Sequence, residues 1–405
     1  MSVLDQASLV QIPSGYKVSK LYSQVPTDGT GDLDFTRSTT ATRVNESGLI
    51  ETVAINVPRL DFTGGGCGKY LFEPQRTNLV TYSNDFSNSN WNTFRGSIVS
   101  NSSISPDNTN NASFFKEDST NNTHVLRTIY NVTNGLTYSF SVFVKKNSIG
   151  RNLQLNCGTT NNEVNFNLQN GTIISSSSSA VGNITEIGDY YRCEITAGVT
   201  NGNDNFDIRL LNNTSDSYLG DGVSGIDIYG VNIEQGEYPT SYIPTSGSTV
   251  TRTEDASSTS GLSSVINSED GVLYIDAIND LRSGLGFFSL SDGSNSNAVS
   301  IKYSSSAISF FVDVAGARQY SETISLTYGV RHKIALQFKN SKFSYYIDGV
   351  KYAEQLSGSI FSANTLSVLN NFQGAGGINF FNGKINELSL FNNLTDSQLI
   401  ALTTI

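Results

Sequence analysis

The sequence predicts an all-β fold class, with two β-sandwich domains after a small N-terminal β-rich anchoring region. Asn, Ser and Thr make up roughly a third of the chain, far above average usage, while the 405 residues include only one Met and one Trp. This composition is poor in the best helix formers and rich in residues that favour strands and polar turns. Short alternating runs recur at intervals of about 8–12 residues, a spacing typical of sandwiches and barrels.

The charge balance and the hydrophobic pattern exclude several classes of protein. The net charge is −11 and no basic block occurs, so nucleic acid is not an expected partner. The chain contains no run of about 18 apolar residues, so no membrane-spanning segment is predicted. The opening MSVLDQASLVQIPSG lacks the basic start and apolar stretch of a secretory signal. Hydrophobic residues make up 37% of the chain, which is enough to bury cores and argues against disorder.

Prolines and turn residues divide the chain into four parts. All seven prolines precede residue 245, and the small, polar stretch that follows them predicts a linker at 246–264. A Gly-rich segment before Pro74 marks a second boundary. We therefore expect an N-terminal region at 1–75, a middle domain at 76–245 and a C-terminal domain at 265–405.

The N-terminal region contains only two clear alternations, near Leu33–Phe35 and Leu49–Ile55. A segment this small cannot bury a core of its own. We expect it to fold against a partner, in an attachment or subunit-interlocking role. The alternative is a β-extension that packs on the middle sandwich.

The middle domain shows strands separated by tight turns. Alternation in GLTYSFSVFVKK places five apolar side chains on one face of a strand: Leu136, Tyr138, Phe140, Val142 and Val144. DIRLL, from Asp207, and GIDIYGVNIE, from Gly225, alternate in the same way. Asn-Gly and Asp-Gly pairs supply the positive φ of hairpin turns, and they occur at Asn134-Gly135, Asn170-Gly171, Asn201-Gly202 and Asp221-Gly222.

The C-terminal domain repeats this pattern. Its predicted strands are GVLYIDAI, GFFSLSDG, VSIKYSS, AISFFVDV, HKIALQF, KFSYYIDGV and GKINELSLFN. Asp348-Gly349 predicts a hairpin turn between KFSYYI and VK. The final LTDSQLIALT predicts one short helix capped by Thr395 or Asp396.

Three stretches resemble segments that recur in tailed-bacteriophage virion proteins: Leu33 to Phe62, Tyr70 to Trp91, and Val231 to Ala256. In that family the second and third bracket a jelly-roll sandwich similar to carbohydrate-binding modules. The C-terminal domain is similar to the laminin-G/concanavalin-A-like lectin sandwich, through KFSYYIDGVKYAE, GKINELSLFNN and LTDSQLIALT.

The resemblance implies a structural virion protein, a head or tail fibre or another appendage, that displays lectin-like domains for attachment to host or mucosal glycans. It implies a homotrimer whose N-terminal region contacts other virion proteins, such as those of the capsid, the portal or collar, or the tail. Such a protein is made in the bacterial host cytoplasm, released by lysis, and located on the virion surface.

Four residues are candidates for glycan binding. Trp91 could stack on a sugar ring; alternatively it plugs the sandwich beside Phe86 and Phe94. Adjacent residues of a strand face opposite sides, so of Tyr190 and Tyr191 one is expected in the core and the other exposed beside Arg192, where it could contact sugar.

No cofactor is expected apart from structural calcium. Carbohydrate-binding modules of this shape often place an acidic residue near the position of Asp227, which lies in the penultimate strand of the middle domain. Asp292 and Asn295, in the Ser289–Asn297 turn, are a second candidate site. Calcium needs six to eight oxygen ligands, and spacing alone does not assemble them; the alternative at Asp292 is an Asx-stabilised turn.

No catalytic residue is predicted. Cys67, Cys157 and Cys193 lack metal-ligand spacing. Cys157 and Cys193 could approach across neighbouring strands, but buried free thiols are expected. The two histidines, His124 and His332, are far apart in the sequence. A polysaccharide depolymerase needs two carboxylates at a fixed separation, and no local pair stands out. The sequence therefore favours a non-enzymatic glycan-binding virion protein, with a decoration protein without sugar binding and a depolymerase spike as alternatives.

Overall fold

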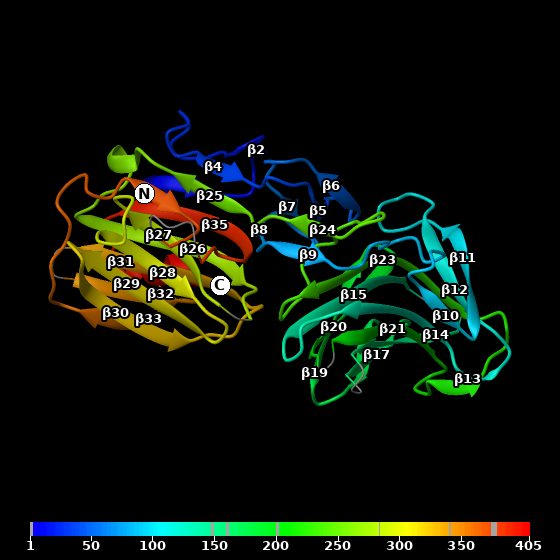
Figure 1. Ribbon diagram of the computed structural model, residues 1–405. Coiled ribbons are helices and arrows are strands. Elements are labelled where there is room, and N and C mark those ends of the chain that lie inside the picture. Colours follow the sequence, from blue (N-terminus) through cyan, green and yellow to red (C-terminus); the bar gives the residue numbers. More distant parts are fainter. Residues whose placement is uncertain are drawn as a thin grey trace.

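The computed structural model describes residues 3–146, 150–158, 162–199, 202–282, 284–339, 342–373 and 379–405. The predicted all-β class with two β-sandwiches is confirmed. Figure 1 shows the two sandwiches as separate lobes, with N-terminal strands running along one side from one lobe to the other. We call them the C-terminal sandwich and the central sandwich.

The first sheet of the C-terminal sandwich, here the β26 sheet, has eight strands and is antiparallel throughout. In spatial order they are β33 (Val350–Gln355), β32 (Lys342–Ile347), β31 (Arg331–Lys339), β26 (Asp270–Asn279), β35 (Gly383–Asn392), β8 (Lys69–Phe72) and β7 (Leu60–Asp61), with β1 (Ala7–Gln11) also paired to β35.

The second sheet, here the β27 sheet, has nine strands. In spatial order they are β2 (Tyr16–Lys17), β3 (Lys20–Leu21), β4 (Leu33–Thr36), β25 (Ala256–Thr259), β34 (Val368–Asn370), β27 (Gly286–Ser291), β28 (Ala298–Tyr303), β29 (Ala307–Val314) and β30 (Ala317–Ser325). Apolar side chains of both sheets form one core, which includes Leu273, Ile301 and Phe310.

The central sandwich consists of two six-stranded sheets. The β15 sheet contains β11 (Gly96–Ser103), β12 (Ala112–Glu117), β23 (Gly225–Gln235), β15 (Thr137–Lys145), β20 (Tyr190–Gly198) and β19 (Ala180–Ile187). The β21 sheet contains β10 (Asn92–Phe94), β14 (Val125–Asn131), β21 (Asn203–Leu211), β16 (Asn152–Cys157), β17 (Glu163–Asn167) and β18 (Thr172–Ser176).

The described structure also contains three two-stranded sheets and three short helices. The pairs are β5 (Ala41–Val44) with β6 (Ile50–Val53), β9 (Arg76–Asn78) with β24 (Val250–Arg252), and β13 (Asn121–Thr123) with β22 (Ser217–Leu219). The short helices are the 3₁₀ segments η1 (Val3–Gln6) and η2 (Leu262–Ser264) and the α-helix α1 (Asp396–Thr403). No helix in the described ranges is long and apolar enough to cross a bilayer.

In strand β15 the alternating apolar residues of the sequence pack into the core of the central sandwich. Tyr138, Phe140, Val142 and Val144 are buried in the central core, as period-two alternation requires. Leu136, expected on the same face, is 38% exposed and precedes the strand. Leu136 comes directly after Gly135, whose φ is +81°. The turn, and not the alternation of the strand, therefore sets the direction of its side chain.

The turn predictions are tested at several places. Gly135, Gly171 and Gly222 all have positive φ. The turn at Gly171 joins the paired strands β17 and β18 as a hairpin, whereas the turns at Gly135 and Gly222 lead from one sheet to another and are not hairpins. Asn201 lies outside the described residues. Asp348 and Gly349 both have positive φ and join β32 to β33, with Ile347 opposite Val350. The hairpin predicted at Asp348-Gly349 is therefore confirmed.

The first 75 residues contribute to both sandwiches. β1 and β8 pair with β35, and β4 pairs with β25, so these strands extend the two sheets of the C-terminal sandwich. The β5–β6 pair instead supplies Val44 and Ile50 to a small core on the central sandwich. The segment expected as a linker, 246–264, itself contains β24 and β25.

Candidate binding cleft between the sandwiches

A buried ionic cluster lies where the N-terminal strands meet both sandwiches. The Glu73 carboxylate, next to β8, accepts hydrogen bonds from Arg59 Nη1 and Arg252 Nη1, each at 2.6 Å. Both guanidinium groups are almost completely buried. Burial raises the pKa of Glu73, but Arg252 and Arg59 outweigh it and hold that pKa well below its usual range.

Asp255 continues this cluster between β24 and β25. Its carboxylate pairs with Arg59 and, at 3.1 Å, with Arg37 Nη1, and it accepts the Glu73 backbone N–H at 2.9 Å. Buried charges are costly to desolvate unless each is paired and hydrogen-bonded. Here every carboxylate oxygen has at least one donor.

The charged residues of the cluster come from three separate segments of the chain, 33–62, 70–91 and 231–256. The first segment supplies Arg37 and Arg59, the second supplies Glu73, and the third supplies Arg252 and Asp255. The third also supplies Ser241, whose backbone N–H donates to Glu73 at 2.7 Å. The three segments therefore meet around one set of charges that joins the two sandwiches.

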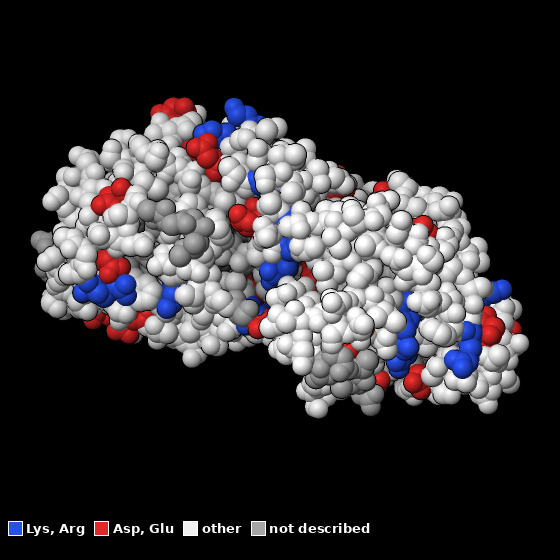
Figure 2. Space-filling view, in the orientation of Figure 1, with Lys and Arg blue, Asp and Glu red and all other residues white. Residues whose placement is uncertain are grey.

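Beside this cluster a cleft of about 410 Å³ opens between the sandwiches. Figure 2 shows a hollow where the lobes meet, with acidic and basic side chains beside it and further charged side chains scattered over both lobes. The central sandwich contributes Asn183, Thr185 and Arg192, and the C-terminal sandwich contributes Asp280, Arg282 and Lys384. Tyr238 and Tyr328 add aromatic rings to the lining.

Most charged groups of the cleft are already paired. Lys384 Nζ lies 2.9 Å from Asp61 Oδ2. Arg192 Nε lies 3.2 Å from Glu194 Oε1. Arg192 Nη2 donates hydrogen bonds to Ser141 Oγ, at 3.0 Å, and to the Thr240 carbonyl.

Asp280 differs from these groups. Its carboxylate makes no hydrogen bond or ion pair with another described residue, although Lys384 and Arg282 are near enough to influence it. Burial raises the pKa of Asp280 to about 6, against the lowering effect of Lys384.

Tyr238 also carries an unused polar group. It is only 8% exposed, and its hydroxyl has no hydrogen-bond partner among the described residues. Its ring lies under the Arg76 guanidinium, 5.5 Å from the ring centroid. Tyr328 is more open, with 38% of its surface exposed, and Arg282 lies over its ring at 5.2 Å.

The predicted sugar-stacking residue Trp91 lies in the central core. It is 5% exposed, its ring centroid is 5.1 Å from that of Phe86, and Nε1 donates to the Tyr82 carbonyl at 3.0 Å. This is the arrangement that the alternative interpretation describes. Phe94, expected beside it, is 42% exposed.

Tyr190 and Tyr191 depart from the expectation that one of them is exposed. They are 2% and 8% exposed. Tyr191 faces the sandwich core, and Tyr190 faces the small core that β5–β6 helps to form on the outer side of the sheet. Both faces of β20 are thus covered, and of the four candidates only Arg192 lines the cleft.

The calcium candidates are engaged with neighbouring polar groups. Asp227 accepts hydrogen bonds from Ser102 and Ser103 at 2.8 and 2.9 Å, and Asp292 accepts from the Ser294 backbone at 2.8 Å. Within the described ranges, no group of three or more His, Cys, Asp or Glu side chains is arranged to hold a metal ion. Calcium binding at either residue stays a prediction.

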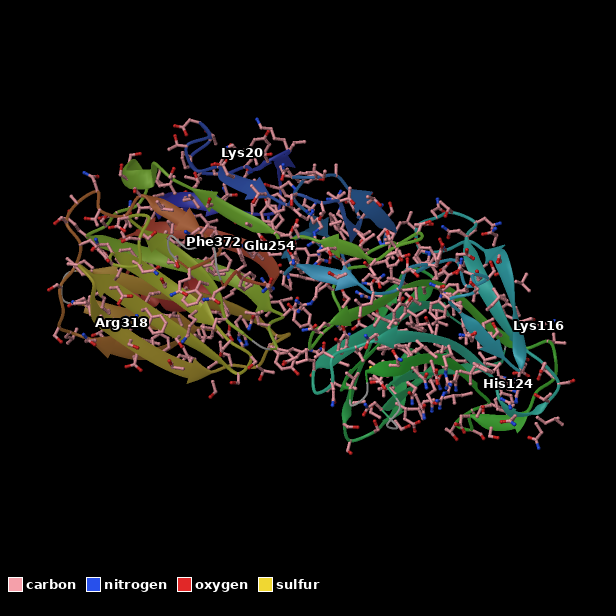
Figure 3. All side chains as sticks on the ribbon, viewed as in Figure 1. Lys20, Lys116, His124, Glu254, Arg318 and Phe372 are labelled. Atoms are coloured by element: carbon pink, nitrogen blue, oxygen red, sulfur yellow. The ribbon has the colours of Figure 1, made fainter. Side chains whose placement is uncertain are left out.

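None of the cysteines or histidines is among the described residues that line the cleft. All three cysteines are free, with Cys157 and Cys193 buried and Cys67 exposed, and burial raises the pKa of Cys157 to about 12. His124, labelled in Figure 3, lies at the outer end of the central sandwich, where Nδ1 contacts the Arg95 carbonyl at 2.6 Å.

Sequence reasoning missed the main residues of the cleft. Asp280, Tyr238 and Lys384 are separated by long stretches of chain, and nothing local distinguishes them. The ionic cluster did leave a signal, because its charged residues lie inside the three segments that the sequence analysis singled out.

Comparison with known proteins gives likenesses of fold. No family model and no curated protein matches the chain. Among solved structures, the carbohydrate-binding module CBM40 of a Ruminococcus gnavus sialidase, bound to α2,3-sialyllactose, has a TM-score of 0.29 and 16% identity, covering 36% of this chain and 91% of that one.

Two other solved structures are similar in the same way. Mouse laminin α1 domains LG4-5 have a TM-score of 0.26 and 11% identity, covering 68% of this chain and 89% of that one. A Bacillus licheniformis β-glucanase has a TM-score of 0.26 and 14% identity, covering 35% of this chain and 73% of that one. At these identities and TM-scores the three structures resemble this chain only loosely.

Proposed function

We propose that this protein is a non-enzymatic glycan-binding protein that holds an oligosaccharide in the cleft between its sandwiches. The observation that carries the proposal is the cleft itself, about 410 Å³ in volume and lined by tyrosine rings together with guanidinium, amide and carboxylate groups. This volume falls within the usual range for small-ligand pockets. Tyrosine rings suit the apolar faces of sugars, while the polar groups suit their hydroxyls.

The pairing of the cleft carboxylates supports binding rather than hydrolysis. A glycoside hydrolase needs one carboxylic acid and a second carboxylate that act on the same bond. Asp61, Glu73 and Glu194 are each engaged by a cation, so among the described lining residues no unpaired second carboxylate is left to act with Asp280.

We further propose that the protein is displayed on a tailed-phage virion as a head or tail fibre or appendage, made in the host cytoplasm and released by lysis. The resemblance of the three segments supports this. A homotrimer attached through its N-terminal region to other virion proteins would present several clefts, and multivalency would strengthen weak individual contacts. Immunogold labelling of intact virions tests the display, and purified particles that lack the protein would overturn it.

One observation favours the alternative of a decoration protein without sugar binding. Three of the predicted sugar-contacting residues, Trp91, Tyr190 and Tyr191, are buried. A glycan array probed with the full chain separates the two proposals, because a silent array together with confirmed virion incorporation supports the alternative.

A variant that fills the cleft tests the site directly. Asn183 is exposed on β19 and lines the cleft, so Asn183→Trp is expected to reduce glycan binding at least tenfold while the protein still folds. Asn122→Trp, at an exposed position of β13 outside the cleft, is the matched control. Array signal and titration calorimetry measure the effect, and unchanged binding in Asn183→Trp would place the sugar elsewhere.

A further inference from the structure

We propose that the cleft selects uncharged sugars, which donate hydroxyl protons to Asp280 and Tyr238, over sugars that carry a carboxylate. The inference rests on the proposed glycan-binding function and names the class of ligand for the same site. It depends on which polar groups of the cleft already have partners.

The cationic side chains that line the described part of the cleft are all engaged. Lys384 pairs with Asp61, and Arg192 contacts Glu194 together with two oxygen acceptors. Arg43 Nε lies 2.6 Å from Glu51 Oε1. At Lys384, Arg192 or Arg43, a sugar carboxylate would have to displace one of these partners to gain a cation.

Arg282 is held by uncharged groups. Its Nη1 donates to the Glu237 carbonyl at 3.3 Å, and its guanidinium covers the Tyr328 ring. Its charge is balanced by nearby Asp280, because Arg282 is among the groups that lower the pKa of that carboxyl. A carboxylated sugar here would place a second negative charge beside Asp280.

The unused groups of the cleft fit sugar hydroxyls. A carboxylate accepts two hydroxyl donors in short, charge-assisted hydrogen bonds, and the Asp280 carboxylate has no such donor among the described residues. The buried Tyr238 hydroxyl is also unpartnered, and a buried polar group without a hydrogen bond is unfavourable. A ligand hydroxyl that reaches Tyr238 would relieve that cost.

This arrangement predicts a pH dependence of binding. Asp280 is influenced by Lys384 and Arg282, by the carboxylates of Glu73 and Asp61, and by Tyr238. Burial raises its pKa to about 6 in the ligand-free protein. Hydroxyl donors stabilise the ionised form, so affinity is highest above pH 6 and falls as pH drops and Asp280 becomes protonated.

The test uses the full chain and paired neutral and carboxylated oligosaccharides of equal length on one array, followed by calorimetry with the strongest neutral binder. We expect neutral sugars to bind at pH 7.5 and affinity to fall roughly tenfold by pH 5. Asp280→Asn should weaken binding at pH 7.5 and remove the pH dependence. Tyr238→Phe should weaken binding about tenfold, as expected for one lost hydrogen bond.

Matched controls separate site effects from general ones. Asp28→Asn changes an exposed carboxylate outside the cleft, and Tyr303→Phe removes another buried, unpartnered hydroxyl in the C-terminal core. Both should bind like the unaltered protein, and circular dichroism confirms that each variant folds. An array silent for every sugar overturns the glycan-binding function. Preferential binding of carboxylated sugars, or unchanged binding in Asp280→Asn, overturns this inference alone.

Discussion

At the scale of single residues, charged side chains have two different roles in this protein. Glu73 and Asp255 are buried and paired with arginines, so they stabilise the junction of the two sandwiches. Asp280 lies near the same junction without a hydrogen-bonded partner among the described residues. The paired carboxylates of Glu73 and Asp255 stabilise the fold. The carboxylate of Asp280, without such a partner among the described residues, is available to a ligand.

We predict that breaking the ionic cluster lowers the free energy of unfolding. Glu73→Gln removes one charge and leaves Arg59 and Arg252 buried without full compensation, so we expect a loss of about 3–5 kcal/mol in the free energy of unfolding. Urea unfolding at pH 7 measures it. Glu254→Gln is the control, since Glu254 lies beside the junction (Figure 3) but outside the paired set.

The pH dependence of stability provides a second readout for the same variant. The folded pKa of Glu73 is lowered, so its contribution is present above the unfolded pKa of about 4.3 and is lost as pH falls. The unaltered protein should therefore lose more stability on acidification than Glu73→Gln does. Equal losses in the two proteins would show that Glu73 is not the charge that holds the cluster.

At the scale of elements, turns and caps were predictable because their signals are local. Thr395 caps α1, its side chain accepting the Gln398 backbone N–H while the Gln398 side chain accepts the Thr395 N–H. This capping box aligns the helix so that Leu399 is buried against the outer face of the β26 sheet. The packing of β20 was less predictable, because β5–β6 covers the face that alternation suggested was exposed.

The cap gives a prediction at the element scale. Thr395→Ala removes the side-chain acceptor at the helix N-terminus and should lower stability by about 0.5–2 kcal/mol. Thr395→Ser keeps the acceptor and should be nearly neutral. Thermal unfolding of both variants checks this, and equal losses would show that the methyl group matters more than the cap.

At the scale of the whole molecule, the N-terminal strands connect the parts. β1, β4, β7 and β8 complete the two sheets of the C-terminal sandwich, while β5–β6 packs on the central sandwich. Figure 1 shows β4 over the C-terminal sandwich and β5 to β8 in the region where the two lobes meet. The cleft exists because this arrangement holds the two sandwiches side by side.

Truncation tests this dependence. A fragment of residues 265–405 lacks the strands that pair with one edge of β35 and part of the core, including Phe35 and Phe72. An open hydrophobic edge favours aggregation, so we expect the fragment to aggregate or unfold, whereas the full chain unfolds cooperatively. Light scattering and circular dichroism measure this. A soluble, cooperatively folded fragment would show that the C-terminal sandwich is independent of the N-terminal strands.

The sequence by itself determined the fold class, most strands, the tight turns and the helix cap. Each depends on residues close together in the chain, through period-two alternation, positive φ at glycine, or a side chain bonded three residues away. Only the tertiary structure decided where the N-terminal strands pair, why Trp91 and both Tyr190 and Tyr191 are buried, and that Asp280 and Tyr238 face one cleft. Those outcomes depend on contacts between residues far apart in the chain, which no local pattern encodes.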